Sequence, residues 1–83
     1  MKLSDIQKTF ILHWGEKATK FGFNRTLAQI HALLYLSPTP LDAEEIAETL
    51  QISRSNVSIS IRELLSWGIV RIVPRMGDRK TYY

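Results

Sequence analysis

The sequence predicts one small, mainly α-helical domain that closes with a short β-hairpin. Three observations support this fold class. Apolar residues recur at spacings of three and four along most of the chain, which is the period of an α-helix. Most of these stretches begin at a residue that can cap a helix and end beside glycine or proline. The last part of the chain instead carries two short β-rich runs on either side of Gly77-Asp78.

The first half of the chain predicts two helices. Ser4 can cap a helix that ends near Gly22, and Asn24 can cap a second helix from about residue 25 to residue 36, ahead of Pro38. The second helix is apolar on nearly all sides, so we expect it to be buried. The first helix carries an apolar stripe that we expect to be core or a dimer seam, formed by Leu3, Ile6, Phe10, Trp14, Ala18 and Phe21.

Two further helix starts share one design. Asp42 can cap a third helix, with Glu45 three residues on as in a capping box, and Ser53 can cap a fourth helix that stops where Trp67 is followed by Gly68. An apolar residue precedes each cap and another stands four places after it, as in a hydrophobic staple. The two pairs are Leu41 with Ile46 and Ile52 with Val57.

The run "VSISI" at residues 57–61 alternates like a half-buried strand, but a helix explains more of its surroundings. Apolar residues continue at i, i+4, i+7 and i+8 and so form one helical face, made of Val57, Ile61, Leu64 and Leu65. Ile59 lies almost opposite the centre of that face and is predicted to point outward. A single exposed isoleucine needs no functional explanation in an arbitrary helix. Its setting here makes a binding role the alternative.

That setting is a helix, a turn at residues 51–53 and a second helix, which together follow the helix-turn-helix plan over about residues 42–67. In such a unit the second helix lies in the major groove of DNA and its N-terminal residues read base edges. Gln51 stands where the turn usually has glycine, and a left-handed backbone there would cost roughly 1 kcal/mol. The candidate base and phosphate contacts of the second helix are Arg54, Ser55, Asn56, Ser58, Ile59 and Arg62.

The end of the chain predicts a wing beside this helix. Strands are expected over Ile69–Val73 and Thr81–Tyr83, with Gly77-Asp78 as a two-residue turn that places Val73 opposite Tyr82. The turn gathers cationic side chains that could reach phosphates or an adjacent minor groove, namely Arg75, Arg79 and Lys80. A solvated turn with no binding role is the alternative.

The charge distribution agrees with a polyanionic partner. Residues 1–51 carry five Lys/Arg against six Asp/Glu, a net charge of −1, whereas residues 52–83 carry six against two, a net charge of +4. The basic character is therefore concentrated in the fourth helix and the wing, although many surfaces are as basic without binding nucleic acid.

Other function classes are less well supported. The chain has no cysteine, and its two histidines have no partners at metal-ligand spacing, so we expect no metal and no cofactor. His13, Glu16 and His31 lack a nucleophile or a phosphate loop, and we expect no enzyme. No apolar run is long enough to span a membrane, which suggests a cytoplasmic protein. Four aromatic side chains could line a pocket for a cationic ligand, but core packing is the preferred interpretation for Trp14, Phe21, Phe23 and Tyr35.

Five strings extend these observations over nearly the whole chain: "HWGE" (13–16), "NRTLAQIHALLYLSPTPLDAEEIAETL" (24–50), "SRSNVS" (53–58), "ELLSWGIVR" (63–71) and "GDRKTYY" (77–83). In these strings the chain resembles the GbsR-like branch of the MarR superfamily of winged helix-turn-helix transcription regulators. The resemblance implies a single DNA-binding domain over residues 1–83. It also implies a homodimer that binds a pseudo-palindromic operator. We expect the first helix to form the dimer contact. We expect a repressor, with an activator as the alternative.

The resemblance further implies that helix 53–67 enters the major groove and that residues 74–80 of the wing lie near the minor groove. On DNA the protein would be associated with the nucleoid. Wings of this superfamily commonly have an acidic residue, one spacer and then arginine, but here Lys80 occupies that arginine position and Arg79 follows Asp78 directly. Relatives also continue beyond the point that corresponds to Tyr83, into helices that help to form the dimer. The competing interpretation is a winged helix that binds only protein, for which binding would be insensitive to salt.

Overall fold

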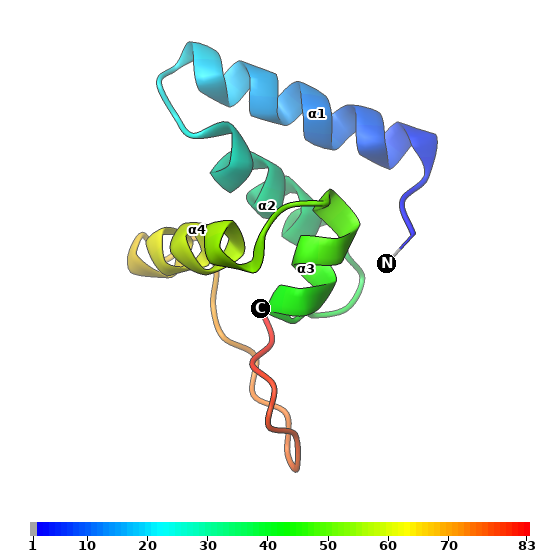
Figure 1. Ribbon diagram of the computed structural model, residues 1–83, viewed down its shortest axis with the longest axis vertical. Coiled ribbons are helices and arrows are strands. Elements are labelled where there is room, and N and C mark those ends of the chain that lie inside the picture. The colour runs from blue at the N-terminus through cyan, green and yellow to red at the C-terminus, as the bar shows by residue number, and fades with distance from the viewer. Residues whose placement is uncertain (1) are drawn as a thin grey trace.

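The computed structural model describes residues 2–83, which form four helices followed by an extended segment (Figure 1). The helices are α1 (Asp5–Lys20), α2 (Arg25–Leu36), α3 (Ala43–Leu50) and α4 (Arg54–Ser66). Residues 69–83, called the C-terminal arm below, project away from the helices and return beside α3. The molecule measures 41 Å along its longest axis, with α1 near one end and the turn of the arm at the other. None of the described helices is both long enough and apolar enough to span a membrane.

Each helix begins at the predicted cap. The Ser4 hydroxyl accepts a hydrogen bond from the Gln7 amide at 3.2 Å, and the Gln7 side chain accepts one from the Ser4 amide. Asp42 caps α3 in the same reciprocal way, and single side-chain caps begin the other two helices at Asn24 and Ser53. These bonds satisfy amide donors that have no partner inside the helix, which is why the helix starts could be predicted closely.

The turn between α3 and α4 contains the strained residue that the sequence suggested. Gln51 has φ 56° and ψ 49°, and no other non-glycine residue among those described has a positive φ. Its backbone N–H donates to the Ala47 carbonyl, and the Ile52 N–H donates to the same oxygen at 3.1 Å. The left-handed conformation thus closes the end of α3 and turns the chain toward α4.

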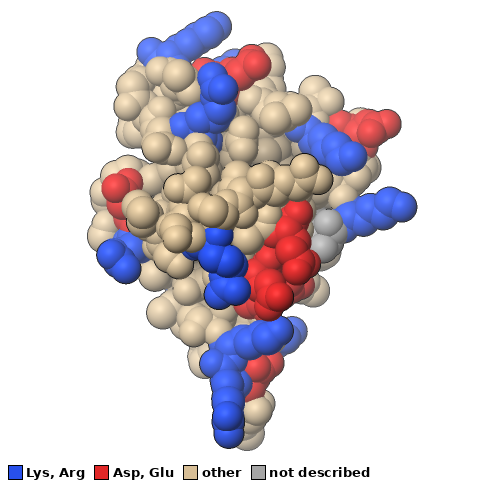
Figure 2. Space-filling view, in the orientation of Figure 1, with Lys and Arg blue, Asp and Glu red and all other residues tan. Residues whose placement is uncertain are grey.

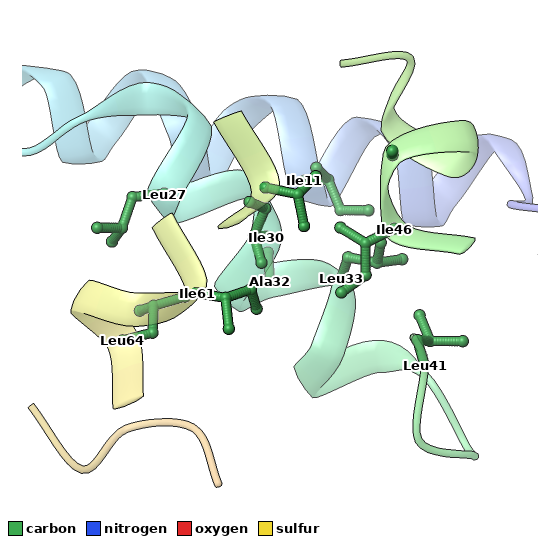
Figure 3. Packing of buried hydrophobic residues seen from close by; sticks show 11 residues of the cluster. Ile11, Leu27, Ile30, Ala32, Leu33, Leu41, Ile46, Ile61 and Leu64 are labelled. Atoms are coloured by element: carbon green, nitrogen blue, oxygen red, sulfur yellow. The ribbon is translucent and has the colours of Figure 1, made fainter. Parts of the chain in front are cut away.

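The core is built around α2, as its uniformly apolar sequence predicts. Ile30 and Leu33 are fully buried, and the side chains around them come from α1, α3, α4 and the segment before α3 (Figure 3). Helix α2 packs against each of the other three helices. Gly15 of α1 is buried, and a Cβ atom at this position would lie 3.1 Å from the Gln29 Cγ. The absence of a side chain at Gly15 therefore lets α1 approach α2 closely.

The structure corrects the core interpretation of the first helix. Ile11 and Gly15 are the buried residues of α1, whereas the four large side chains of the predicted stripe from Ile6 onward are exposed, and Leu3 and Ala18 are partly buried. Of that stripe, 84% of Ile6, 40% of Phe10, 42% of Trp14 and 80% of Phe21 is exposed. Core packing is also wrong for the other two aromatic residues of the predicted set, because Phe23 and Tyr35 are exposed. Helix α1 is rotated so that Ile11 and Gly15 face α2, while Trp14 contacts it only at the edge, through the His31 ring.

The structure also corrects the predicted wing, because no β-strand forms within the described residues. Of the predicted hairpin, a single bridge between Val73 and Tyr82 remains, in which the Val73 N–H donates to the Tyr82 carbonyl at 2.8 Å. The predicted pairing of these two residues is confirmed, but the turn is shifted to residues 76–77. Pro74 has no N–H to extend the ladder. The side chain of Asp78 accepts the Lys80 N–H at 3.0 Å, which removes a second donor.

A pairing that the sequence did not predict holds the returning leg of the arm. The Leu41 N–H donates to the Tyr83 carbonyl at 3.1 Å, and the Tyr83 N–H donates to the Leu41 carbonyl at 2.9 Å. The adjacent residues Asp42 and Tyr82 form an antiparallel bridge. The arm is thus joined to the residues that begin α3.

Candidate nucleic-acid interface

Helix α4 has one buried face and one exposed face. Val57 and Leu64 are fully buried and Ile61 is 3% exposed, whereas Ile59 is 57% exposed. This confirms the predicted helical phase of residues 57–61. The exposure of Ile59 follows from the burial of its neighbours at helical spacing, so a fold that buries Val57 and Ile61 leaves Ile59 on the surface.

The polar candidates of α4 lie on the exposed side. Those assigned to base or phosphate contact are all exposed: Arg54, Ser55, Asn56, Ser58 and Arg62. Ser60, which was not assigned, is 7% exposed. The first turn of α4 contains no acidic residue, so the positive end of the helix dipole is not neutralised by its own side chains. An anion at this end would gain from both the helix amides and Arg54.

A cleft brings the start of α4 together with the arm. It has a volume of about 300 Å³ and is lined by Arg54 and Ser58 from α4, by Lys80 and Thr81 from the arm and by residues at the start of α3. A neighbouring cavity of about 270 Å³ includes Ser58 and Arg62. Three predicted site residues, Arg54, Ser58 and Lys80, therefore meet at one cleft. Arg75 and Arg79 do not line it and lie on either side of the turn of the arm.

The three cations near the turn of the arm have different environments. The Arg75 guanidinium lies 4.3 Å from the centre of the Tyr82 ring, within cation–π range. The Lys80 ammonium Nζ lies 3.5 Å from the Asp42 Oδ2. Arg79 has no ion pair, ring contact or side-chain hydrogen bond with any residue in the part of the chain that the structure describes.

The ion pair between Asp42 and Lys80 perturbs both groups. Burial acts to raise the pKa of the Asp42 carboxyl, but the hydrogen bond from the Glu45 amide and the charge of Lys80 outweigh it, so the pKa lies below its ordinary 3.8. The Asp42 carboxylate in turn raises the pKa of the Lys80 ammonium above 10.5. Both groups are therefore charged at neutral pH.

Charges on the surface divide the molecule into regions. Figure 2 shows Lys and Arg gathered at the arm, while the most prominent acidic patch lies over α3. Three glutamates, Glu44, Glu45 and Glu48, belong to that helix. A polyanion is therefore attracted to the arm and repelled by the exposed side of α3.

The sequence pattern of the MarR family matches residues 21–80, which is most of the chain and includes α2, α3, α4 and the arm as far as Lys80. The chain belongs to the MarR family. The cationic arm and the exposed face of α4 are features typical of a nucleic-acid-binding surface. Among residues 2–83 of this MarR-family chain, no three His, Cys, Asp or Glu side chains are grouped to hold a metal ion.

Comparisons with individual proteins agree with the family assignment. The chain is 28% identical over 81 residues to YvaV of Bacillus subtilis strain 168, a protein provisionally named an HTH-type transcriptional regulator. It is 26% identical over 69 residues to the HTH-type transcriptional repressor OpcR of the same organism. These alignments cover 98% and 83% of this chain but only 46% and 37% of the relatives, so the MarR-family chain spans less than half of their length.

A solved structure also has the same fold. The crystal structure of a transcriptional regulator superposes with a TM-score of 0.86 and 25% sequence identity, over 92% of this MarR-family chain and 52% of that protein. The two relatives and the protein of the solved structure are all named as transcriptional regulators or repressors.

Sequence reasoning missed two residues that organise the interface. Asp42 was interpreted only as a helix cap and Tyr82 only as a strand residue, but they hold Lys80 and Arg75 respectively. The spacing of residues 78, 80 and 82 could have suggested that they act together. Side chains two residues apart lie on the same side of an extended segment. Asp78 and Tyr82 on that side form a hydrogen bond.

Proposed function

We propose that this chain is the DNA-binding domain of a GbsR-like regulator, extending over residues 1–83. In the proposed complex the helix-turn-helix of residues 42–67 places α4 in the major groove of double-stranded DNA. The arm acts as the wing, with residues 74–80 near the minor groove. We propose a repressor, for which the name of one relative, the repressor OpcR, is supporting evidence. Such a protein would work in the cytoplasm, on the nucleoid.

The observation that carries this proposal is the exposed face of α4. Short polar side chains allow a helix to approach base edges closely, and Ser55, Asn56 and Ser58 supply both donors and acceptors. Ile59, 57% exposed between them and Arg62, can contact a thymine methyl group. Arg54 and Arg62 are placed for phosphates, which set the position of a protein on the duplex.

A titration at two salt concentrations tests the proposal. Labelled DNA from upstream of the protein's own gene is compared with a scrambled duplex of equal length and composition. We expect tighter binding to the upstream duplex and a steep loss of affinity as salt rises, because phosphate neutralisation releases counterions. Equal affinity for both duplexes would contradict sequence-specific recognition. Binding of a protein partner that is insensitive to salt, with Ile59 in the contact, would favour the alternative of a protein-interaction module.

We further propose that the protein forms a homodimer through α1 on a pseudo-palindromic operator. The support is the exposed apolar stripe of α1, in which Ile6, Phe10 and Trp14 follow one another at intervals of four residues. Phe10 and Trp14 stack with their ring centres 6.1 Å apart, so this stripe presents an ordered aromatic surface. Two-fold symmetry would place two copies of α4 on successive half-sites.

A further inference from the structure

The arm is held together by one buried tyrosine. Tyr82 is 7% exposed, and its hydroxyl donates to the Asp78 Oδ2 at 2.8 Å. The other oxygen of Asp78 accepts the Lys80 backbone N–H at 3.0 Å. The Arg75 guanidinium covers the Tyr82 ring at 4.3 Å. The contacts of Asp78 shape the returning leg, while the Arg75–Tyr82 contact and the backbone bond from the Val73 N–H to the Tyr82 carbonyl join the two legs.

Asp42 fixes the arm to the helices. One of its carboxylate oxygens accepts the Glu45 N–H at 2.8 Å, and the other lies 3.5 Å from the Lys80 ammonium. The Asp42 side chain is only 8% exposed, whereas 59% of the Lys80 side chain is exposed. If Lys80 left this position, a largely buried carboxylate would lose its counter-charge, which is costly.

The cations near the turn of the arm differ in whether their side chains already have a partner. Lys80 is engaged with Asp42 and Arg75 with the Tyr82 ring, so each would have to give up a contact in order to bind a phosphate. Arg79 has no such partner in residues 2–83 and lies between Asp78 and Lys80, both of which are held. Its guanidinium is thus free for a ligand while its backbone is fixed.

We propose that Lys80 and Asp42 are positioning residues that hold the arm against the start of α3, and that Arg79, among the three cations near the turn, is the phosphate contact. The assignment to phosphate rests on the proposed DNA-binding function. Lys80 occupies the position that is usually arginine in wings of this superfamily. The proposal nevertheless gives the phosphate contact to the neighbouring Arg79.

The contact is tested by the salt dependence of DNA binding. Arg79→Gln and Lys80→Gln remove the same charge at adjacent positions, so each is the control for the other. We expect Arg79→Gln to reduce the slope of log affinity against log salt by about 0.9, the value of one phosphate contact on duplex DNA. Lys80→Gln should reduce the slope by clearly less, because Arg79 keeps its charge although the arm is held less firmly. An equal reduction by both variants, or by Lys80→Gln alone, would overturn the assignment.

The positioning role is tested without DNA, by amide hydrogen exchange at Val73, whose N–H bonds across the arm to Tyr82. We expect Lys80→Gln and Asp42→Asn to accelerate exchange several-fold and to a similar extent, and the double variant to add little, because the two residues act as a pair. Asn retains the cap of α3. Lys80→Arg should restore slow exchange, and Glu44→Gln, an exposed acid beside the same lysine, should leave it unchanged.

The two experiments separate the possible failures. Exchange in Lys80→Gln that equals that of the unaltered protein would refute the positioning role while leaving the proposed function intact. DNA binding by the unaltered protein that does not depend on salt would refute the proposed function and, with it, the role of Arg79.

Discussion

Ile59 and Ile61 belong to one helix turn but have opposite environments, which makes them a matched pair. Ile59 is 57% exposed and Ile61 is 3% exposed. We expect Ile59→Ser to leave the melting temperature nearly unchanged and to weaken specific DNA binding by about 1–3 kcal/mol, the usual scale for one base position. Ile61→Ser should instead destabilise the fold, because it removes buried apolar volume and places a hydroxyl in the core. Thermal unfolding and a binding titration measure the two effects.

Two results would contradict the prediction for Ile59. If Ile59→Ser unfolds the domain, the side chain contributes to a core that the exposed fraction does not reveal. If binding is unaffected while the fold is intact, Ile59 does not contact the bases.

Gln51 gives a second prediction at this scale. A left-handed backbone disfavours residues with a Cβ atom, so Gln51→Gly should stabilise the protein by about 1 kcal/mol. For a domain of this size that gain raises the melting temperature by roughly 4–8 °C. Gln51→Ala keeps the Cβ atom and serves as the control, with little change expected. A lower melting temperature for Gln51→Gly would show that the glutamine side chain contributes more than the backbone strain costs.

At the residue scale the sequence predicts a feature correctly where that feature depends only on residues nearby in the chain. The caps at Ser4, Asn24, Asp42 and Ser53 follow from hydrogen bonds made within three residues. The exposure of Ile59 follows from helical period alone. The partners of Asp42 and Tyr82 could not be found in this way, because they depend on how the arm folds back on the helices.

Between the elements, the attachment of the arm to α3 predicts a dependence of stability on pH. The pKa of the Asp42 carboxyl lies below 3.8 in the folded protein, so its contribution is complete above that pH and is lost as the pH falls through the folded value. The pKa of Lys80 lies above 10.5 when folded, so its contribution is complete below that pH and is lost as the pH rises through the higher folded value.

Denaturant unfolding from pH 2 to pH 12 tests this attachment. We expect Asp42→Asn to flatten the curve at both ends, because it removes the carboxylate and the counter-charge of Lys80 together. Asp78→Asn, which also removes a carboxylate of lowered pKa, should alter the acid end but leave the partner of Lys80 in place. An Asp42→Asn curve that parallels that of the unaltered protein would show that the ion pair does not couple the arm to α3.

At the element scale the sequence predicted which helices form but not how α1 is rotated. Spacings of three and four identify an apolar stripe, yet they do not say whether it meets the same chain or a partner. Contact with α2 is decided by Gly15, which permits close approach, and by Ile11, which is buried in the core. The strands of the arm were predicted from β propensity, which Pro74 and the side chain of Asp78 override.

For the whole molecule, the arrangement in Figure 1 separates two surfaces, with α1 near one end and the arm at the other. A partner on the exposed face of α1 would therefore leave the arm and its cations accessible. In the proposed dimer this arrangement would increase the DNA surface contacted, because a single module of this kind buries limited area.

The dimer can be tested with two apolar residues on different sides of α1. Ile6, on the proposed seam, is 84% exposed and Leu12, away from it, is 58% exposed, so glutamate at either position should be tolerated by the fold. Burial of one isoleucine contributes about 1.5–3 kcal/mol, and Ile6→Glu should weaken dimerisation at least tenfold. Leu12→Glu should have little effect. Light scattering over a range of concentrations, with and without operator DNA, measures the change. Unaltered protein that remains monomeric and binds as one subunit per duplex would contradict the dimer.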